Sequence, residues 1–147
     1  MKRVIFLSLI IAMIIGSCTQ QEKKSQVEGT WRLVYAKWNM NKQTFTFPDQ
    51  ISGEQIKMLT KGHMTFIGQY KLPTDTMFRP KYGWATYTLN GNKFEEIVKF
   101  HYVKEAIGMS IRMLMEVRND TLIQKYSTDE NWELPEKYDT EIYVRLD

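Results

Sequence analysis

The predicted fold of this chain is decided by one stretch, Gly29-Thr30-Trp31-Arg32-Leu33-Val34-Tyr35-Ala36-Lys37-Trp38. Its residues alternate as in a β-strand, which places Trp31, Leu33 and Tyr35 on one face. Gly29 allows the chain to turn in tightly, and Trp31 is large enough to plug one end of an apolar interior. Later segments predict further strands, and we expect these to close on the first one.

The residues before this strand predict export and lipid attachment. A basic start is followed by an apolar run of 12 residues, 4–15, which is too short to span a bilayer and suits a signal peptide. The run ends in Ile15-Gly16-Ser17-Cys18, which resembles a bacterial lipobox. We therefore expect a signal peptide at 1–17, a lipidated Cys18 and a polar tether at 18–27. The alternative is a chance cysteine after an ordinary signal peptide.

The lipobox reading predicts a membrane-anchored lipoprotein of the bacterial cell envelope, with the outer membrane favoured over the inner. Removal of residues 1–17 lowers the formal net charge from +3 to +1, because Lys2 and Arg3 are the only charged residues there. No basic face then remains to indicate nucleic-acid binding. Cys18 is the only cysteine, so a disulfide within the chain is excluded. Residues 28–147 are enough for one domain with its own core.

Turn signals and alternation predict a meander of antiparallel strands. Asn90-Gly91 is a strong hairpin signal, because a type I′ turn needs positive φ at both positions, and Asn119-Asp120 marks a second hairpin. The form of a capping box at 52–55 favours a short helix that ends at Gly62. The predicted strands are 29–38, 44–47, 62–70, 82–89, 93–102, 107–118, 121–128 and 139–146, with polar loops at 71–81 and 129–137.

These strands predict an all-β, antiparallel up-and-down barrel of about eight strands in a single domain. An open sheet of this size would leave two exposed edges, and closure removes them. A turn at Asn90-Gly91 pairs Tyr87 with Phe94 and Ala85 with Glu96. The more apolar faces of the two hairpins are expected to point inward, and they hold Gly83, Ala85, Tyr87, Phe94, Glu96, Val98, Phe100, Met109, Ile111, Met113, Met115, Val117, Leu122, Gln124 and Tyr126.

Glu96 is the most informative side chain of this predicted interior. A buried carboxylate must be neutral, hydrogen-bonded or paired, because burial of an isolated charge is costly. Glu96 is therefore either a polar anchor for a ligand or part of a structural network with Tyr35, Tyr87 or Tyr126. The inward methionines indicate either core packing or an adaptable cavity. The candidate ligand-binding residues are Tyr35, Tyr70, Tyr87, Glu96, Phe100, Met113, Gln124 and Tyr126.

Gly29-Thr30-Trp31 at the start of the first strand resembles the Gly-x-Trp motif of lipocalins. Arg145 in the last strand resembles the arginine that packs against that tryptophan. The wider pattern, including 57–60, 83–92 and 94–96, is similar to the short lipocalin-like domains of bacterial lipoproteins, and it covers residues 28–147. The resemblance implies a barrel with a small-molecule cavity, with Trp31 and Arg145 as its structural plug. This chain is shorter than secreted lipocalins and lacks their disulfides and C-terminal helix.

The leading functional hypothesis is a lipid-anchored envelope protein whose barrel binds a small apolar or amphipathic molecule, as a carrier, sensor or scavenger. The second is an interaction module with a filled barrel, whose loops would use Met77, Phe78 and Trp132 to contact another envelope protein. The third is an enzyme acting inside the cavity, although the sequence has no catalytic motif. No cofactor is implied, and the lone histidines His63 and His101 do not indicate a metal site. An open interior of several hundred Å³ would favour the first hypothesis over the second.

Overall fold

The computed structural model describes residues 25–40, 42–126 and 128–147. The predicted signal peptide, Cys18 and most of the tether lie outside these residues. The described residues form nine strands and one 3₁₀ helix: β1 (Gly29–Met40), β2 (Gln43–Phe47), β3 (Ser52–Thr60), β4 (His63–Lys71), β5 (Arg79–Asn90), β6 (Lys93–His101), η1 (Lys104–Ala106), β7 (Ser110–Arg118), β8 (Thr121–Tyr126) and β9 (Thr140–Arg145). None of the helical structure in this part of the chain is long and apolar enough to cross a bilayer.

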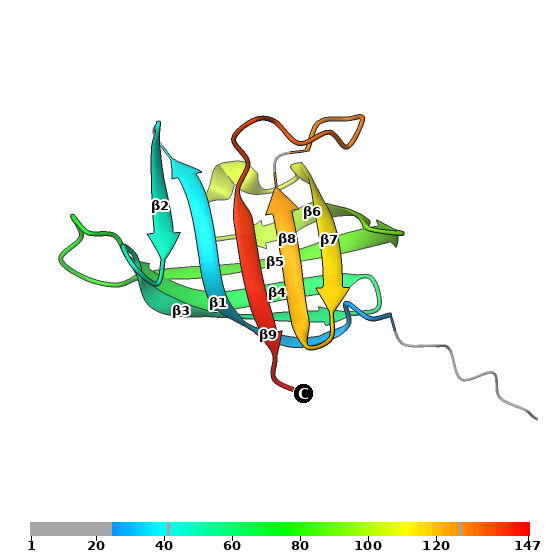
Figure 1. Cartoon of the computed structure of the whole chain (residues 1–147), viewed down its shortest axis with the longest axis horizontal. Helices are drawn as coiled ribbons and strands as arrows, with labels where there is room; N and C mark the ends of the chain where they lie inside the picture. The colour runs from blue at the N-terminus through cyan, green and yellow to red at the C-terminus, as the bar shows by residue number, and fades with distance from the viewer. Residues whose placement is uncertain (1–24, 41, 127) are drawn as a thin grey trace, which may run out of the picture.

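The strands form one closed antiparallel barrel. From β3 to β9 each strand pairs with the next, and β9 pairs with β1 to close the ring. The start of β1 pairs with β3, whereas its end pairs with β2, so β2 extends the wall beside the eight-stranded ring. Strands β1, β9, β8 and β7 cross the front of the barrel, and β3, β4 and β5 cross behind them (Figure 1). The predicted all-β, up-and-down, lipocalin-like barrel of a single domain is confirmed.

The two hairpins differ in how closely they follow the prediction. The β7–β8 pairing is as predicted, with Met113 opposite Tyr126. In the β5–β6 hairpin Asn90 pairs with Lys93, so that Tyr87 lies opposite Glu96 rather than Phe94. The two central residues of the turn are Gly91 and Asn92, and Gly91 takes a positive φ of 61°. The predicted turn had Asn90 and Gly91 at the centre and needed a positive φ at both. The shift is by two residues, so each side chain keeps its predicted face.

Two β-bulges turn predicted inward residues outward. The first lies at Val34 in β1, and after it Ala36 and Trp38 replace Tyr35 on the inner face. The second lies at Lys99 in β6, and Phe100 beyond it is 55% exposed. The predicted inward orientations of Tyr35 and Phe100 are therefore wrong. An extra residue in one strand reverses the alternation that follows it. Met109, which precedes β7, is also exposed rather than inward.

Residues 52–60 form strand β3, and the predicted short helix is wrong. The whole segment pairs with β4, and its second half also pairs with β1. The backbone hydrogen bonds that β3 makes with β4 and β1 stabilise the strand more than a capping box would stabilise a short helix. Gly53 lies so close to β4 that a Cβ at this position would come within 2.1 Å of the Gln69 carbonyl oxygen. The absence of a side chain at Gly53 therefore allows the backbones of β3 and β4 to lie close together at this point.

One end of the barrel is closed by Trp31, as predicted. The ring is fully buried, and its Nε1 donates a 2.8 Å hydrogen bond to the Val27 carbonyl. The guanidinium carbon of Arg145 lies 4.1 Å from the ring centroid, which confirms the predicted stacking. Arg145 also donates to the carbonyls of Gln26 and Glu28, which fixes the segment leading into β1. A Cβ on Gly29 would meet the guanidinium at 2.3 Å, so the motif needs glycine here.

Candidate functional site

A cavity of about 810 Å³ occupies the end of the barrel opposite Trp31. It lies among the ends of β1, β4 and β6 and the starts of β5 and β7. Its walls carry large apolar side chains: Trp38, Met40, Ile51, Met64, Phe66, Leu72 and Ile111. The barrel is therefore not filled by its own phenylalanines and methionines. The volume is in the range of sites that take small organic molecules.

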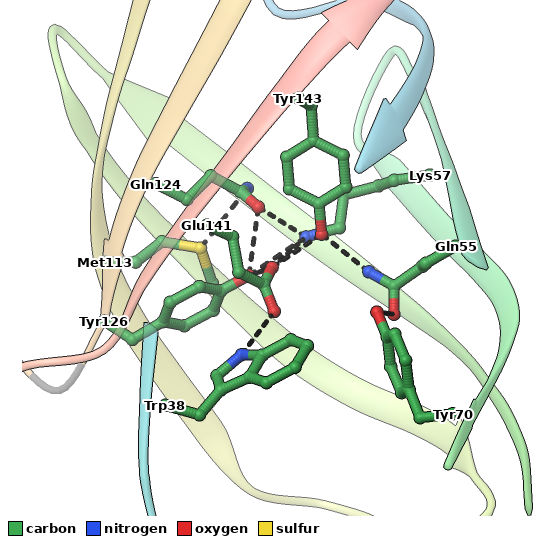
Figure 2. Close-up of polar contacts among 9 residues, drawn as sticks. All are labelled: Trp38, Gln55, Lys57, Tyr70, Met113, Gln124, Tyr126, Glu141 and Tyr143. Carbon is green, nitrogen blue, oxygen red and sulfur yellow. Dashed lines mark hydrogen bonds and ion pairs between the residues drawn. The ribbon is translucent and has the colours of Figure 1, made fainter. Parts of the chain in front are cut away.

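The floor of this cavity holds a buried lysine. Lys57 of β3 points inward and is only 3% exposed. Its ammonium donates to Gln124 Oε1 at 2.5 Å and to the Tyr126 hydroxyl at 3.0 Å, and it lies 3.4 Å from Glu141 Oε2 (Figure 2). These three contacts use all three N–H groups of a lysine. The buried charge is thus satisfied entirely by protein groups.

Glu141 of β9 is the acceptor at the centre of this network. Its Oε2 accepts hydrogen bonds of 2.5 Å from the hydroxyls of Tyr126 and Tyr143, and its Oε1 accepts one from Trp38 Nε1 (Figure 2). Burial acts to raise the pKa of Glu141, but Lys57 and these donors outweigh it, so the pKa is lowered. Glu141 is therefore ionised at neutral pH and forms a buried ion pair with Lys57.

A second branch of the network crosses the barrel. Gln55 Nε2 donates to the Tyr143 hydroxyl at 2.6 Å, and the Tyr70 hydroxyl donates to Gln55 Oε1 at 3.0 Å. Burial, reinforced by the charge of Glu141, raises the pKa values of Tyr70, Tyr126 and Tyr143. These hydroxyls remain protonated at neutral pH and act as donors. The network joins side chains from β1, β3, β4, β8 and β9.

Glu96 of β6 lies at the edge of this network without joining it. The side chain is 6% exposed and lines the cavity, and its Oε2 has no hydrogen-bond partner. Burial raises the pKa of Glu96 to about 7, although Lys57 acts to lower it and Glu141 adds a smaller upward contribution. The direction of this shift is the one expected from burial in an apolar interior. Glu96 therefore holds its proton to a higher pH than an exposed carboxyl group does.

The mouth of the cavity is ringed by charged residues that are mostly paired with neighbours. Arg79 pairs with Asp75, and Arg112 pairs with Glu95. Lys81 donates to the Tyr102 hydroxyl at 2.9 Å and lies over the same ring. These charged groups make the entrance polar, while the walls below are apolar.

The structure brings together only some of the predicted ligand-binding residues. Tyr70, Glu96 and Tyr126 line the cavity. Met113 and Gln124 are buried and in contact with each other, but neither lines the cavity. The predicted residues that lie away from it are Tyr35, Tyr87 and Phe100.

Tyr87 has a structural role at some distance from the cavity. Its hydroxyl donates to the Thr60 carbonyl, and its ring stacks on Phe94 with a centroid distance of 4.5 Å. Glu96 Oε2 has no hydrogen-bond partner, so the predicted network of Glu96 with Tyr35, Tyr87 or Tyr126 is not formed at that atom. Its place is taken by the network around Glu141.

Sequence reasoning missed Lys57, Gln55 and Glu141. Period-2 alternation through β3 would have placed Gln55, Lys57 and Leu59 on one face, but the predicted helix hid this signal. His101 was also missed, because the bulge at Lys99 brings it inward beside Phe66. A Cβ on Gly83 would meet the Phe66 ring at 2.4 Å, so the space beside this glycine is filled by Phe66.

Replacement of Glu96 by glutamine is expected to change how stability depends on pH. A folded pKa near 7 against an unfolded value near 4.5 means that the folded state holds the proton longer as pH rises. The wild-type free energy of unfolding should therefore fall between these two values, and the loss persists above pH 7. Glu96→Gln should abolish this fall. The free energy of unfolding of the variant should equal that of wild type near pH 4 and exceed it by on the order of 3 kcal/mol at pH 8. Urea denaturation across this range measures it.

A control for this prediction is Glu116→Gln, because Glu116 lies on the surface and pairs with Arg118. This change should leave the fall between pH 4.5 and 7 in place. An unchanged pH profile in Glu96→Gln would show that Glu96 ionises freely in the folded state.

Comparison with known proteins identifies no family for this chain. A scan against protein-family models and a search of curated proteins both find no match to the chain. Within the described residues, no group of three His, Cys, Asp or Glu side chains is placed to hold a metal ion.

Proposed function

We propose that this protein is a lipid-anchored component of the bacterial cell envelope whose lipocalin-like barrel binds a small amphipathic molecule. The observation that supports this most is the 810 Å³ cavity, with apolar walls above a polar floor. Apolar walls contribute affinity, and a few fixed polar groups orient the ligand. Lys57 and Glu141 are hydrogen-bonded to each other and to their neighbours without a ligand, so the polar floor is formed before binding.

Binding of the neutral dye N-phenyl-1-naphthylamine tests this proposal directly. The purified protein should enhance the dye's fluorescence with saturable binding. Ile111→Trp, which adds a large ring to the cavity wall, should weaken binding at least tenfold. Ile67→Trp is the matched control, because Ile67 lies exposed on the outer face of β4. Equal binding by both variants, or none by wild type, would contradict a ligand site in the barrel. Native mass spectrometry of protein purified gently from its own envelope then tests for a natural ligand.

The lipid anchor is tested separately at Cys18. Cys18→Ala should remove the acylated product and leave a soluble or uncleaved form, because the cysteine sulfur is the proposed site of lipid attachment. Cell fractionation and mass spectrometry of the N-terminal peptide measure this outcome. A membrane-bound, acylated product from Cys18→Ala would contradict the proposed anchor.

A second candidate function is contact with another envelope protein. One observation favours it: the outer face of β4, β5 and β6 exposes Ile67, Trp84 and Phe100, with Tyr82 stacked on Phe100 at 5.6 Å. Monomeric proteins seldom expose large contiguous apolar patches. A photo-cross-linking residue in place of Trp84 should give one discrete adduct in intact cells, and the same residue in place of Arg118 should give none. Equal labelling from both positions would argue against a specific partner.

A further inference from the structure

Two buried polar atoms without a hydrogen-bond partner belong to residues that line the same cavity. They are Glu96 Oε2 and Thr128 Oγ1. Buried polar groups in proteins are nearly always paired, and each exception needs a physical reason. The tyrosine hydroxyls, glutamines and lysine around them are joined in a continuous network. The two unpaired atoms therefore identify where a bound molecule would make its polar contacts.

The charges of the floor restrict the sign of that molecule. Lys57 contributes one positive charge, Glu141 contributes one negative charge, and Glu96 adds a second negative charge when it is ionised. The tyrosines that face the same space remain neutral. The floor thus has a formal charge of −1 with Glu96 ionised, and a single cation would neutralise it.

The existing lysine cannot supply this neutralisation at Glu96 Oε2, because its N–H groups are directed to Gln124, Tyr126 and Glu141. For the same reason Lys57 has no free N–H for the carboxylate of a fatty acid. At the mouth, Arg79 and Arg112 already hold carboxylates. Lys81 at the mouth already donates a hydrogen bond to the Tyr102 hydroxyl.

We propose that the natural ligand is an amphipathic amine, with one protonated amino group on an apolar body. This proposal rests on the proposed ligand-binding function. The ammonium donates to Glu96 Oε2, and the Thr128 hydroxyl makes a second contact with the same head group. The aromatic rings of Trp38, Phe66 and Tyr70 line the same cavity and favour a cation over a neutral head group. The apolar body lies against Ile51, Met64 and Ile111.

Binding of such an amine depends on pH through Glu96. The charged and titratable groups that line the same cavity include Lys57, Glu141, Tyr126 and His101. The pKa of Glu141 is lowered and that of Tyr126 is raised, while burial lowers the pKa of His101 below its usual value of 6.5. Glu96 is the carboxyl group among them whose pKa is raised to about 7. An ammonium binds the ionised carboxylate, so affinity should rise as Glu96 loses its proton. Between pH 6 and pH 8 the ionised fraction rises about tenfold for a pKa near 7, and the affinity should follow it.

Three probes with ten-carbon apolar chains distinguish the head groups: decylamine, decanol and decanoic acid. Decylamine and decanoic acid are used below their critical micelle concentrations, and decanol is used below its solubility limit. Isothermal titration calorimetry at pH 8 should give at least tenfold tighter binding of decylamine than of the other two. Glu96→Gln should remove this preference and its pH dependence, and leave decanol binding within twofold. Thr128→Val should weaken decylamine binding by about threefold or more, and Glu116→Gln should have no effect.

The outcomes distinguish this inference from the proposed function. If wild type binds neither N-phenyl-1-naphthylamine nor any of the three probes, the ligand-binding function itself fails. If the neutral dye binds, but decylamine binds no better than decanol or keeps its affinity in Glu96→Gln, the cavity is real and the amine assignment is wrong. In that case ordered water alone satisfies Glu96. Tighter binding of decanoic acid would assign the cavity to anions instead.

Discussion

Trp31→Ala should lower the free energy of unfolding by about 3–5 kcal/mol, the usual cost of truncating a fully buried large aromatic side chain. Three contributions are lost together. The ring is 0% exposed, its Nε1 bonds the Val27 carbonyl, and its face supports the guanidinium of Arg145. Without the ring, Arg145 also loses the support that holds it against the carbonyls of Gln26 and Glu28. A loss of this size is a large part of the stability of a small domain.

The matched control for this prediction is Trp84→Ala, because Trp84 is 41% exposed on the outer face, where its ring stacks on that of His63. Its cost should be about 1 kcal/mol or less. Trp31→Phe should fall between the two, since it keeps a ring beneath Arg145 and loses the hydrogen bond to Val27. Chemical denaturation of the three variants at one pH gives the comparison. Similar midpoints for Trp31→Ala and Trp84→Ala would mean that Trp31 does not close the barrel.

Lys57→Met should be equally damaging, at about 3–5 kcal/mol at neutral pH, because it leaves Glu141 as a buried charge without its cation. In wild type the lowered pKa of Glu141 contributes stability that is present above its unfolded pKa and is lost as pH falls through the folded pKa. Without Lys57, burial dominates and the pKa of Glu141 rises. The penalty of Lys57→Met should then shrink as pH falls and Glu141 takes up a proton. Denaturant titrations at pH 5 and pH 8 measure this difference.

The double variant Lys57→Met/Glu141→Gln completes this test. Replacing both members of a buried ion pair by uncharged groups of similar size is often much less costly than removing one. We therefore expect the double variant to be more stable at pH 8 than Lys57→Met alone, and to lose the pH dependence of the single variant. Strictly additive costs of the two changes would show that Lys57 and Glu141 do not stabilise each other.

The sequence alone determined the fold class, because alternation and turn chemistry are local properties of the chain. The β7–β8 hairpin pairs as the position of Asn119-Asp120 predicts. Glu96 lies on its predicted inner face even though the β5–β6 register differs, since a shift of two residues conserves parity. The stacking of Arg145 on Trp31 followed from the resemblance to lipocalins, and the structure confirms it.

The composition of the site was decided only by the tertiary structure. On β3 the usual polarity is inverted: Gln55 and Lys57 point into the barrel, while Met58 is exposed on the outside. A local pattern cannot predict this inversion, because a lysine is stable in the interior only when partners such as Glu141 and Gln124 arrive from strands far away in the sequence. Bulges have the same non-local origin. The curvature needed to close the ring places an extra residue at Val34 and at Lys99, and each one reverses the faces of the residues that follow.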